Sequence, residues 1–171
     1  TPAALITELN QRLPAPTIQS NKPVAPRLEH AILEDEVRIQ VCAWGVNFID
    51  VLGYHGIHPT MSQAQQAPGH EVSGIVIEVG RSVTHLKVGD RVMALAAYGA
   101  FSTDLVTKGY LTQIIPSNLS LVAGASVFVN GLTAISCIET AGCVQSGDRV
   151  LIHSAAGGTG LACTQLALSK G

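Results

Sequence analysis

A glycine-rich loop near the end of the chain, AAGGTG at residues 155–160, has the residue types that bind a phosphate group. Against the pattern G-x-G-x-x-G, its key positions are Ala155, Gly157 and Gly160. The second position lets a pyrophosphate approach the backbone without a Cβ in the way, and the third lets helix and strand pack closely. Backbone N–H groups and the partial positive charge at a helix start then hold the anion. The loop has no Lys or Arg, so the backbone must supply most of this binding.

The residues around this loop predict the elements that would position it. Gly147–Asp148 is a turn signal, Arg149–His153 reads as a short strand, and an amphipathic helix is expected to begin near Gly158. Strand, loop and helix in this order form the start of a βαβ unit. An ordinary strand-to-helix turn is the alternative, but the combination favours a dinucleotide.

A second group of candidate residues, PGHEVSG at 68–74, raises the question of a metal. His70 and Glu71 are possible ligands, but a catalytic zinc needs about three protein ligands that converge. Asn47 stands where a cysteine would be needed, and residues 127–129 are apolar where a third ligand is wanted. The sequence therefore predicts no metal site, and a structural or pocket-wall role for His70.

Composition excludes several classes of protein. Apolar residues make up 47% of the 171 residues and charged residues 13%, which predicts a sizeable buried core rather than disorder. The net charge is −2 and the basic residues are scattered, so neither a nucleic acid nor a membrane surface is expected as a partner. The four cysteines form no C-x-x-C pair, and the first residues lack the pattern of a signal peptide, so we expect a cytoplasmic protein. Residues 109–138 carry no charge, but proline, glycine and asparagine interrupt them, so buried core is favoured over a membrane span.

The chain divides into three predicted parts. Residues 1–27 are expected to form a helix and a proline-rich linker. Residues 28–125 change to the two-residue period of strands, with Val37, Ile39 and Val41 facing inward and a turn at Gly89–Asp90. Short strands with turn signals favour a partly open β-barrel. Residues 126–171 read as helical and then as the beginning of a dinucleotide-binding domain, which makes the chain α/β overall with an α+β N-terminal part.

Four segments carry a resemblance to a known family: AWGVNFIDVLGYHG, PGHEVSGIVIEVG, VTHLKVGDRVMAL and LIHSAAGGTGLACTQLA. Together they resemble the zinc-independent branch of the medium-chain dehydrogenase/reductase superfamily. The enoylreductase domains of modular polyketide and fatty acid synthases are the most similar members, and quinone oxidoreductases come next. The resemblance runs from about Leu28 to Gly171. It implies a GroES-like barrel that leads into a Rossmann domain, with NADPH in the cleft between them.

The resemblance also implies roles for individual residues. Asn47 would face the nicotinamide end of the cleft, although Asn is also a favoured helix cap. Thr133 resembles a threonine that contacts the nicotinamide side, although on sequence alone it reads as a helix-packing residue. The pyrophosphate would be held by the loop residues Ala155, Ala156, Gly157, Gly158, Thr159 and Gly160.

The implied reaction is a conjugate reduction of an α,β-unsaturated thioester carried by an acyl carrier. Hydride from NADPH adds to the β-carbon, and the resulting enolate takes a proton at the α-carbon. Tyr54, His55 and His58 are candidate proton donors, with exposed loop residues as the alternative reading. Relatives often carry tyrosine where His58 stands, and Ile49 is commoner in the quinone-reductase-like relatives, whereas many synthase enoylreductases have arginine there.

Three readings therefore remain open. The chain is an enoylreductase domain of a polyketide synthase, a free-standing NADPH:quinone or alkenal oxidoreductase, or a non-catalytic truncated reductase that acts as a spacer. A dinucleotide domain needs further strands and an adenine pocket after the glycine loop. We therefore expect the chain to be an excerpt, whose partners are other synthase domains or a missing C-terminal half. The first residues, TPAALITELNQRL, resemble the last helix of an acyl carrier domain, with a plain N-terminal helix as the alternative; the carrier interpretation would favour a synthase.

Overall fold

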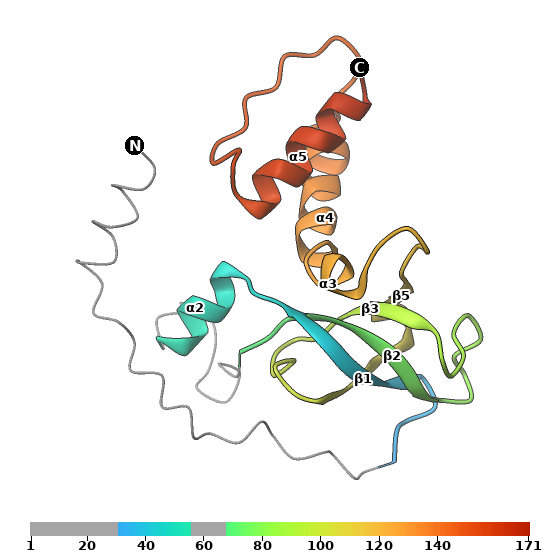
Figure 1. The fold of residues 1–171 in the computed structure, drawn as a ribbon. Helices are drawn as coiled ribbons and strands as arrows, with labels where there is room; N and C mark the ends of the chain where they lie inside the picture. The colour runs from blue at the N-terminus through green and yellow to red at the C-terminus, as the bar shows by residue number, and fades with distance from the viewer. Residues whose placement is uncertain (1–30, 56–67) are drawn as a thin grey trace.

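A computed structural model describes residues 31–55 and 68–171. Its centre is an antiparallel sheet of five strands in the order β4-β1-β2-β3-β5 (Figure 1). The predicted N-terminal helix and linker at residues 1–27 lie outside the described residues, as does His58. The strands are β1 (Glu36–Gly45), β2 (Glu71–Val79), β3 (Arg91–Leu95), β4 (Asp104–Lys108) and β5 (Thr112–Ile114).

The alternating apolar residues of the first two long strands build the core of the sheet. Val37 and Ile39 on β1 are fully buried, and Val72 and Val76 on β2 pack in the same cluster. This pattern arises because successive side chains of a strand point to opposite faces. The inward orientation predicted for residues 37 and 39 is therefore confirmed, and Val41 packs against the same cluster while partly buried.

The sheet is curved, as a partly open barrel requires. The pairing of β1 with β2 shifts register between Arg38 and Ile39, and again between Val41 and Ala43. Such irregularities bend a strand and increase its twist. In the sheet order, β1 and β2 lie between β4 and β3. The hydroxyl of Thr107 on β4 nevertheless donates to the carbonyl of Leu95 on β3 at 2.7 Å, so the sheet curls back on itself. The mixed helix and strand fold with an open, curled sheet agrees with the predicted fold class.

Two G-D-R-V segments show what local sequence can and cannot specify. Gly89 and Gly147 both have positive φ, at 92° and 87°, and the aspartate after each accepts a backbone N–H from three residues earlier. The first segment continues into β3, which pairs with β2. The second, predicted as the strand Arg149–His153, forms no strand. That prediction was wrong because no described residue offers the backbone partner that a strand needs.

The last third of the described chain contains helices, with an irregular segment between Gly142 and Gly157. A second, smaller core joins Ala134 and Ile138 to Cys163, so that α4 and its π-helical continuation η3 pack beside α5. These helices stand away from the sheet (Figure 1), and α3 and the first turn of α4 connect them to it. The predicted boundary at residues 125 and 126 falls between the two cores and remains a prediction. The helices are α2 (Phe48–Tyr54), η2 (Gly109–Leu111), α3 (Leu121–Gly124), α4 (Phe128–Ile135), η3 (Ser136–Ala141) and α5 (Gly158–Ser169).

None of the helices in the described ranges is long and apolar enough to cross a membrane.

Candidate cofactor-binding site

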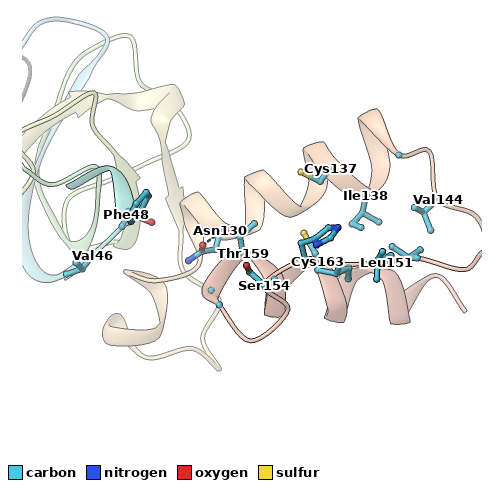
Figure 2. Close-up of a pocket in the computed structure, with 18 residues that line it drawn as sticks. Val46, Phe48, Asn130, Cys137, Ile138, Val144, Leu151, Ser154, Thr159 and Cys163 are labelled. Carbon is cyan, nitrogen blue, oxygen red and sulfur yellow. Dashed lines mark hydrogen bonds between the residues drawn. The ribbon is translucent and has the colours of Figure 1, made fainter. Parts of the chain in front are cut away.

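A cavity of about 640 Å³ lies between the helical part and the turn that joins β1 to α2. Its walls come from three places far apart in sequence: residues 46–48, the helices α4 and η3, and the segment 150–160 (Figure 2). A volume of this size is typical of a ligand site. The lining residues are Val46, Asn47, Phe48, Asn130, Cys137, Ile138, Gly142, Val144, Val150, Leu151, Ile152, His153, Ser154, Gly157, Gly158, Thr159, Gly160 and Cys163.

The last three residues of the glycine loop, Gly158 to Gly160, form the start of α5. A Cβ at Gly160 would overlap the carbonyl oxygen of Ser154 and approach the Cα of Ala155 at 2.6 Å, so only glycine lets the helix start pack on the loop. A Cβ at Gly157 would meet only that carbonyl oxygen, at 3.4 Å. Gly160 therefore serves the packing of the loop, whereas the space beside Gly157 is left open at the cavity wall.

A side chain of α4 is bonded to the glycine loop. Asn130 accepts a hydrogen bond at its Oδ1 from Thr159 Oγ1 at 2.9 Å, and its amide nitrogen donates to the carbonyl of Ser126 at 3.0 Å. A Cβ at Gly158 would approach the same amide nitrogen at 2.8 Å. Figure 2 shows Asn130 and Thr159 next to each other in the middle of the row of lining residues. The loop is thus fixed to α4 through Asn130.

A buried carboxylate connects the two walls of the cavity. Glu71, at the start of β2, is 1% exposed. Its Oε1 accepts from the amide nitrogen of Asn47 at 2.9 Å, and its Oε2 accepts from the backbone N–H of Val129 at 2.9 Å. Val129 lies in the first turn of α4, one residue before Asn130. Glu71 therefore bonds to the β1–α2 turn with one oxygen and to the start of α4 with the other.

A second buried carboxylate, Asp50, holds the short helix α2 against the start of β2. It accepts from the backbone N–H of Asn47, from that of Gly69 and from the ring Nδ1 of His70, each at 2.7 Å. The remaining ring nitrogen of His70 is buried and has no hydrogen-bond partner among the described residues. His70 does not line the cavity, and its contact with Asp50 fits a structural role. The described residues contain no group of three or more His, Cys, Asp or Glu that could hold a metal ion.

The structure brings together some of the residues that the sequence singled out and separates others. Asn47 and the loop residues from Gly157 to Gly160 line the cavity. Ala155 and Ala156 belong to the loop but not to the lining. Thr133 is exposed on α4, where its hydroxyl donates to the carbonyl of Val129 at 2.7 Å. Tyr54 is 62% exposed at the end of α2, with its ring 5.3 Å from that of His55.

Sequence reasoning missed two residues of this site. Glu71 was considered only as a metal ligand beside His70, and Asn130 was not considered. A carboxylate directly before an alternating apolar strand is a signal for a buried acid, because it must share the burial of its neighbours and then needs partners. Asn130 had no such signal, because its contact with Thr159 depends on how α4 and α5 pack.

The cavity fits the phosphate-bearing part of a nicotinamide dinucleotide. The open space at Gly157 would admit an anion close to the backbone, and the first N–H groups of a helix such as α5 have no partners within the helix. Among the described residues, no Lys or Arg lines the cavity, so backbone groups would be the main donors at the loop. The residues present therefore agree with a pyrophosphate held at the start of α5.

Comparison with known proteins connects this arrangement to a family. Residues 33–113 match the family described as "Alcohol dehydrogenase GroES-like domain". The crystal structure of CurK enoyl reductase has a TM-score of 0.75 and 34% sequence identity, covering 85% of this chain and 46% of that chain. The Escherichia coli quinone oxidoreductase complexed with NADPH has a TM-score of 0.75 and 32% identity, covering 84% of this chain and 44% of that chain.

Sequence relatives include members of the same two groups. The highly reducing polyketide synthase valA of Aspergillus terreus is 38% identical over 141 residues, which are 82% of this chain and 5% of that protein. Quinone oxidoreductase-like protein 2 of Mus musculus is 39% identical over 165 residues, which are 96% of this chain and 45% of that protein. The chain thus spans about half the length of its quinone oxidoreductase-like relatives and a small part of the synthase.

The match to the GroES-like domain covers the strands of the sheet up to residue 113, and the glycine loop follows it in the same chain. The predicted resemblance to the medium-chain dehydrogenase/reductase superfamily is confirmed, because the homologues of this chain are quinone oxidoreductase-like proteins and enoyl reductases of polyketide synthases.

Proposed function

We propose that this chain contributes the GroES-like part and the pyrophosphate-binding loop of an NADPH-dependent enoylreductase domain of a polyketide synthase. The observation that carries the proposal is the cavity lined jointly by Asn47, Asn130 and residues 157–160. The cavity is bordered by the glycine loop at the start of α5 and by the turn between β1 and α2. A cofactor that contacts both the helical part and the sheet needs a cavity bordered by both.

In this proposal the loop holds the pyrophosphate through backbone N–H groups. Gly157 leaves room for the anion, and Gly160 keeps the helix start in place. Ala155 and Ala156 shape the turn. The bond between Thr159 and Asn130 holds the loop against α4. The proposed preference for NADPH over NADH comes from the resemblance alone. In the general dinucleotide pattern, the glycine loop contacts the pyrophosphate and not the ribose hydroxyls that distinguish the two cofactors.

The sheet side of the cavity would orient the reactive end. When bound, NADPH supplies the hydride for the β-carbon of the unsaturated acyl chain. Asn47 lies at the start of α2 with its amide nitrogen fixed by Glu71, so it offers a polar group of set orientation at this wall. Thr133 is proposed for the nicotinamide side, although in this structure its hydroxyl bonds to its own helix.

The α-carbon needs a proton, for which Tyr54 and His58 are the proposed donors. Tyr54 is exposed at the end of α2, seven residues after Asn47 in the sequence. Its phenol or the imidazole of His58 would protonate the enolate, a role that general acids of this type perform. Substituting Tyr54 and His58 separately and measuring kcat distinguishes between the two donors.

The proposed substrate is an unsaturated thioester on an acyl carrier, and the proposed partners are other synthase domains or a C-terminal half. Homologues of this chain are parts of large multidomain polyketide synthases. Such a substrate arrives on a tethered arm, which raises its effective concentration at the cavity. A cytoplasmic location belongs to the same proposal.

A second candidate function is reduction of free quinones or alkenals by NADPH. The observation in its favour is the likeness to a quinone oxidoreductase-like protein over nearly the whole chain. Ile49, the residue commoner in such relatives, points the same way.

One experiment separates these functions. The purified protein is given NADPH with a crotonyl-type thioester, and in parallel with a small quinone, and NADPH consumption is followed by absorbance. Faster turnover of the thioester supports the enoylreductase, and turnover of the quinone alone supports the second candidate. A protein that neither binds NADPH nor consumes it contradicts both and favours a structural spacer.

A further inference from the structure

Glu71 takes no part in the proposed chemistry, yet its charged side chain is buried close to the cavity. It is 1% exposed, and burial of a carboxylate is costly unless both oxygens find donors. Both do: Oε1 is bonded to Asn47 Nδ2 and Oε2 to the N–H of Val129, each at 2.9 Å. A buried carboxylate bonded to two separate elements restrains both of them.

The two partners belong to two different elements that border the cavity. Asn47 lines it from the β1–α2 turn. Val129 lies in the first turn of α4 and precedes Asn130, which lines the cavity and bonds to Thr159 of the glycine loop. The hydrogen bonds therefore run from Asn47 through Glu71 to the first turn of α4, and from Asn130 on to the loop.

Space around Glu71 allows little adjustment. A Cβ at Gly45, the last residue of β1, would overlap the side chain of Glu71 and the carbonyl oxygen of Ala125. The carboxylate is thus enclosed by backbone as well as by its two donors. A side chain packed in this way transmits a change at one partner to the other, because it cannot relax into solvent.

We propose that Glu71 is a positioning residue that sets the orientation of the Asn47 amide and the placement of α4, and so the separation of the two walls that bind the cofactor. The inference rests on the proposed function. A carboxylate only accepts hydrogen bonds, so it selects the amide nitrogen of Asn47 as its partner. The backbone N–H of Val129 is held in direction by helix α4, so the second carboxylate oxygen of Glu71 must be its acceptor.

Exchange of donor and acceptor tests this contact. In Glu71→Gln, the remaining oxygen still accepts from Val129, but the new NH₂ cannot accept from Asn47, so the Asn47 amide must reverse and present its oxygen. In Asn47→Asp, two carboxylates face each other. In the double variant, the glutamine NH₂ donates to the new aspartate, and the bond is restored with its direction reversed. Glu78→Gln, on the same strand and half-exposed, is the matched control, because it removes a carboxylate far from the cavity.

NADPH affinity is measured by fluorescence titration and stability by urea unfolding for all five proteins. We expect Glu71→Gln to weaken NADPH binding about tenfold in the wild-type background, a loss typical of one hydrogen bond to a charged group. In the Asn47→Asp background we expect the same substitution to strengthen binding about tenfold or more. Glu71→Gln should likewise lower the urea midpoint in the wild-type background and raise it in the Asn47→Asp background. Glu78→Gln should bind NADPH like the wild type.

The possible results are distinguishable. If Glu71→Gln weakens binding in both backgrounds, the contact does not set Asn47 and the inference is overturned. If only the urea midpoint shows the change of sign while affinities stay equal, Glu71 is merely structural and the inference is likewise overturned. If Asn47→Asp alone fails to fold, recovery of a folded, binding protein in the double variant supports the inference, and failure to recover contradicts it. A wild-type protein that binds no NADPH rejects the proposed function itself, and with it the positioning role.

Discussion

The hydroxyl of Thr159 in the glycine loop donates to the amide oxygen of Asn130 on α4 at 2.9 Å. These residues are 29 positions apart in the sequence, and both line the cavity. Because α4 is also bonded to Glu71 through Val129, the loop is connected to the sheet by side-chain and backbone hydrogen bonds rather than by the chain alone. The position of the loop therefore depends on α4.

Removing the hydroxyl of Thr159 should loosen the loop. Thr159→Val keeps the shape and leaves the amide oxygen of Asn130 without its donor, so we expect a loss of about 1 kcal/mol in unfolding free energy. NADPH binding should weaken about fivefold. Thr164→Val is the matched control, since that hydroxyl bonds to the carbonyl of Gly160 within its own helix. Equal NADPH affinities for the two variants, measured by fluorescence titration, would argue against a role for the Asn130 contact.

The two key glycines of the loop should respond differently to alanine. Gly160→Ala places a Cβ against the backbone of Ser154 and Ala155, and we expect a loss of stability of about 1–3 kcal/mol. Gly157→Ala meets only one atom at 3.4 Å, so its stability should stay near wild type. If a pyrophosphate approaches the backbone there, Gly157→Ala should nevertheless weaken NADPH binding more than tenfold. Thermal unfolding and NADPH titration of both variants check this contrast. Normal NADPH binding by a folded Gly157→Ala protein would contradict binding of the pyrophosphate at the loop.

Substitution of the proposed proton donors should lower turnover without changing NADPH affinity. Tyr54→Phe keeps the ring and its contact with His55 but removes the phenol proton. If Tyr54 protonates the α-carbon, kcat should fall by about 10²–10⁴. His58→Gln is assayed beside it under the same conditions. Unchanged kcat in both variants would exclude both donors.

Acid should weaken the contact between the ends of β1 and β4. The backbone N–H of Leu33 and, after it, the ammonium of Lys108 hold the pKa of Glu36 below its ordinary value of 4.5. Because the pKa is lowered in the folded state, this carboxylate stabilises the fold above pH 4.5, and the contribution is lost as pH falls further. The acid side of a plot of urea midpoint against pH should be less steep for Glu36→Gln than for the wild type. Parallel curves for the two proteins would contradict this assignment.

The sequence predicted those parts of the fold whose causes are local. The turns at Gly89–Asp90 and Gly147–Asp148 form as expected, because a glycine of positive φ and an aspartate side chain close each of them. The alternation in β1 predicted its buried face. The strand at 149–153 was predicted by the same kind of pattern and is absent, since a strand also depends on a neighbour that the pattern does not contain.

The candidate site was predicted only in its loop. A glycine pattern at the start of a helix identifies itself through spacing, and residues 157–160 do line the cavity. Asn130 and Glu71 act through contacts between elements distant in the sequence, and such contacts follow from packing rather than from local pattern. Thr133 was selected by resemblance, and its exposed position on α4 leaves its role a prediction.

The central claim is that the cavity between the glycine loop and the β1–α2 turn binds NADPH, and fluorescence titration of the purified protein with NADPH tests it most directly. The account predicts saturable binding by the wild type and binding weakened more than tenfold by Gly157→Ala, with thermal unfolding of the variant unchanged. Absence of binding in the folded wild-type protein, or equal affinities for the two proteins, would contradict it.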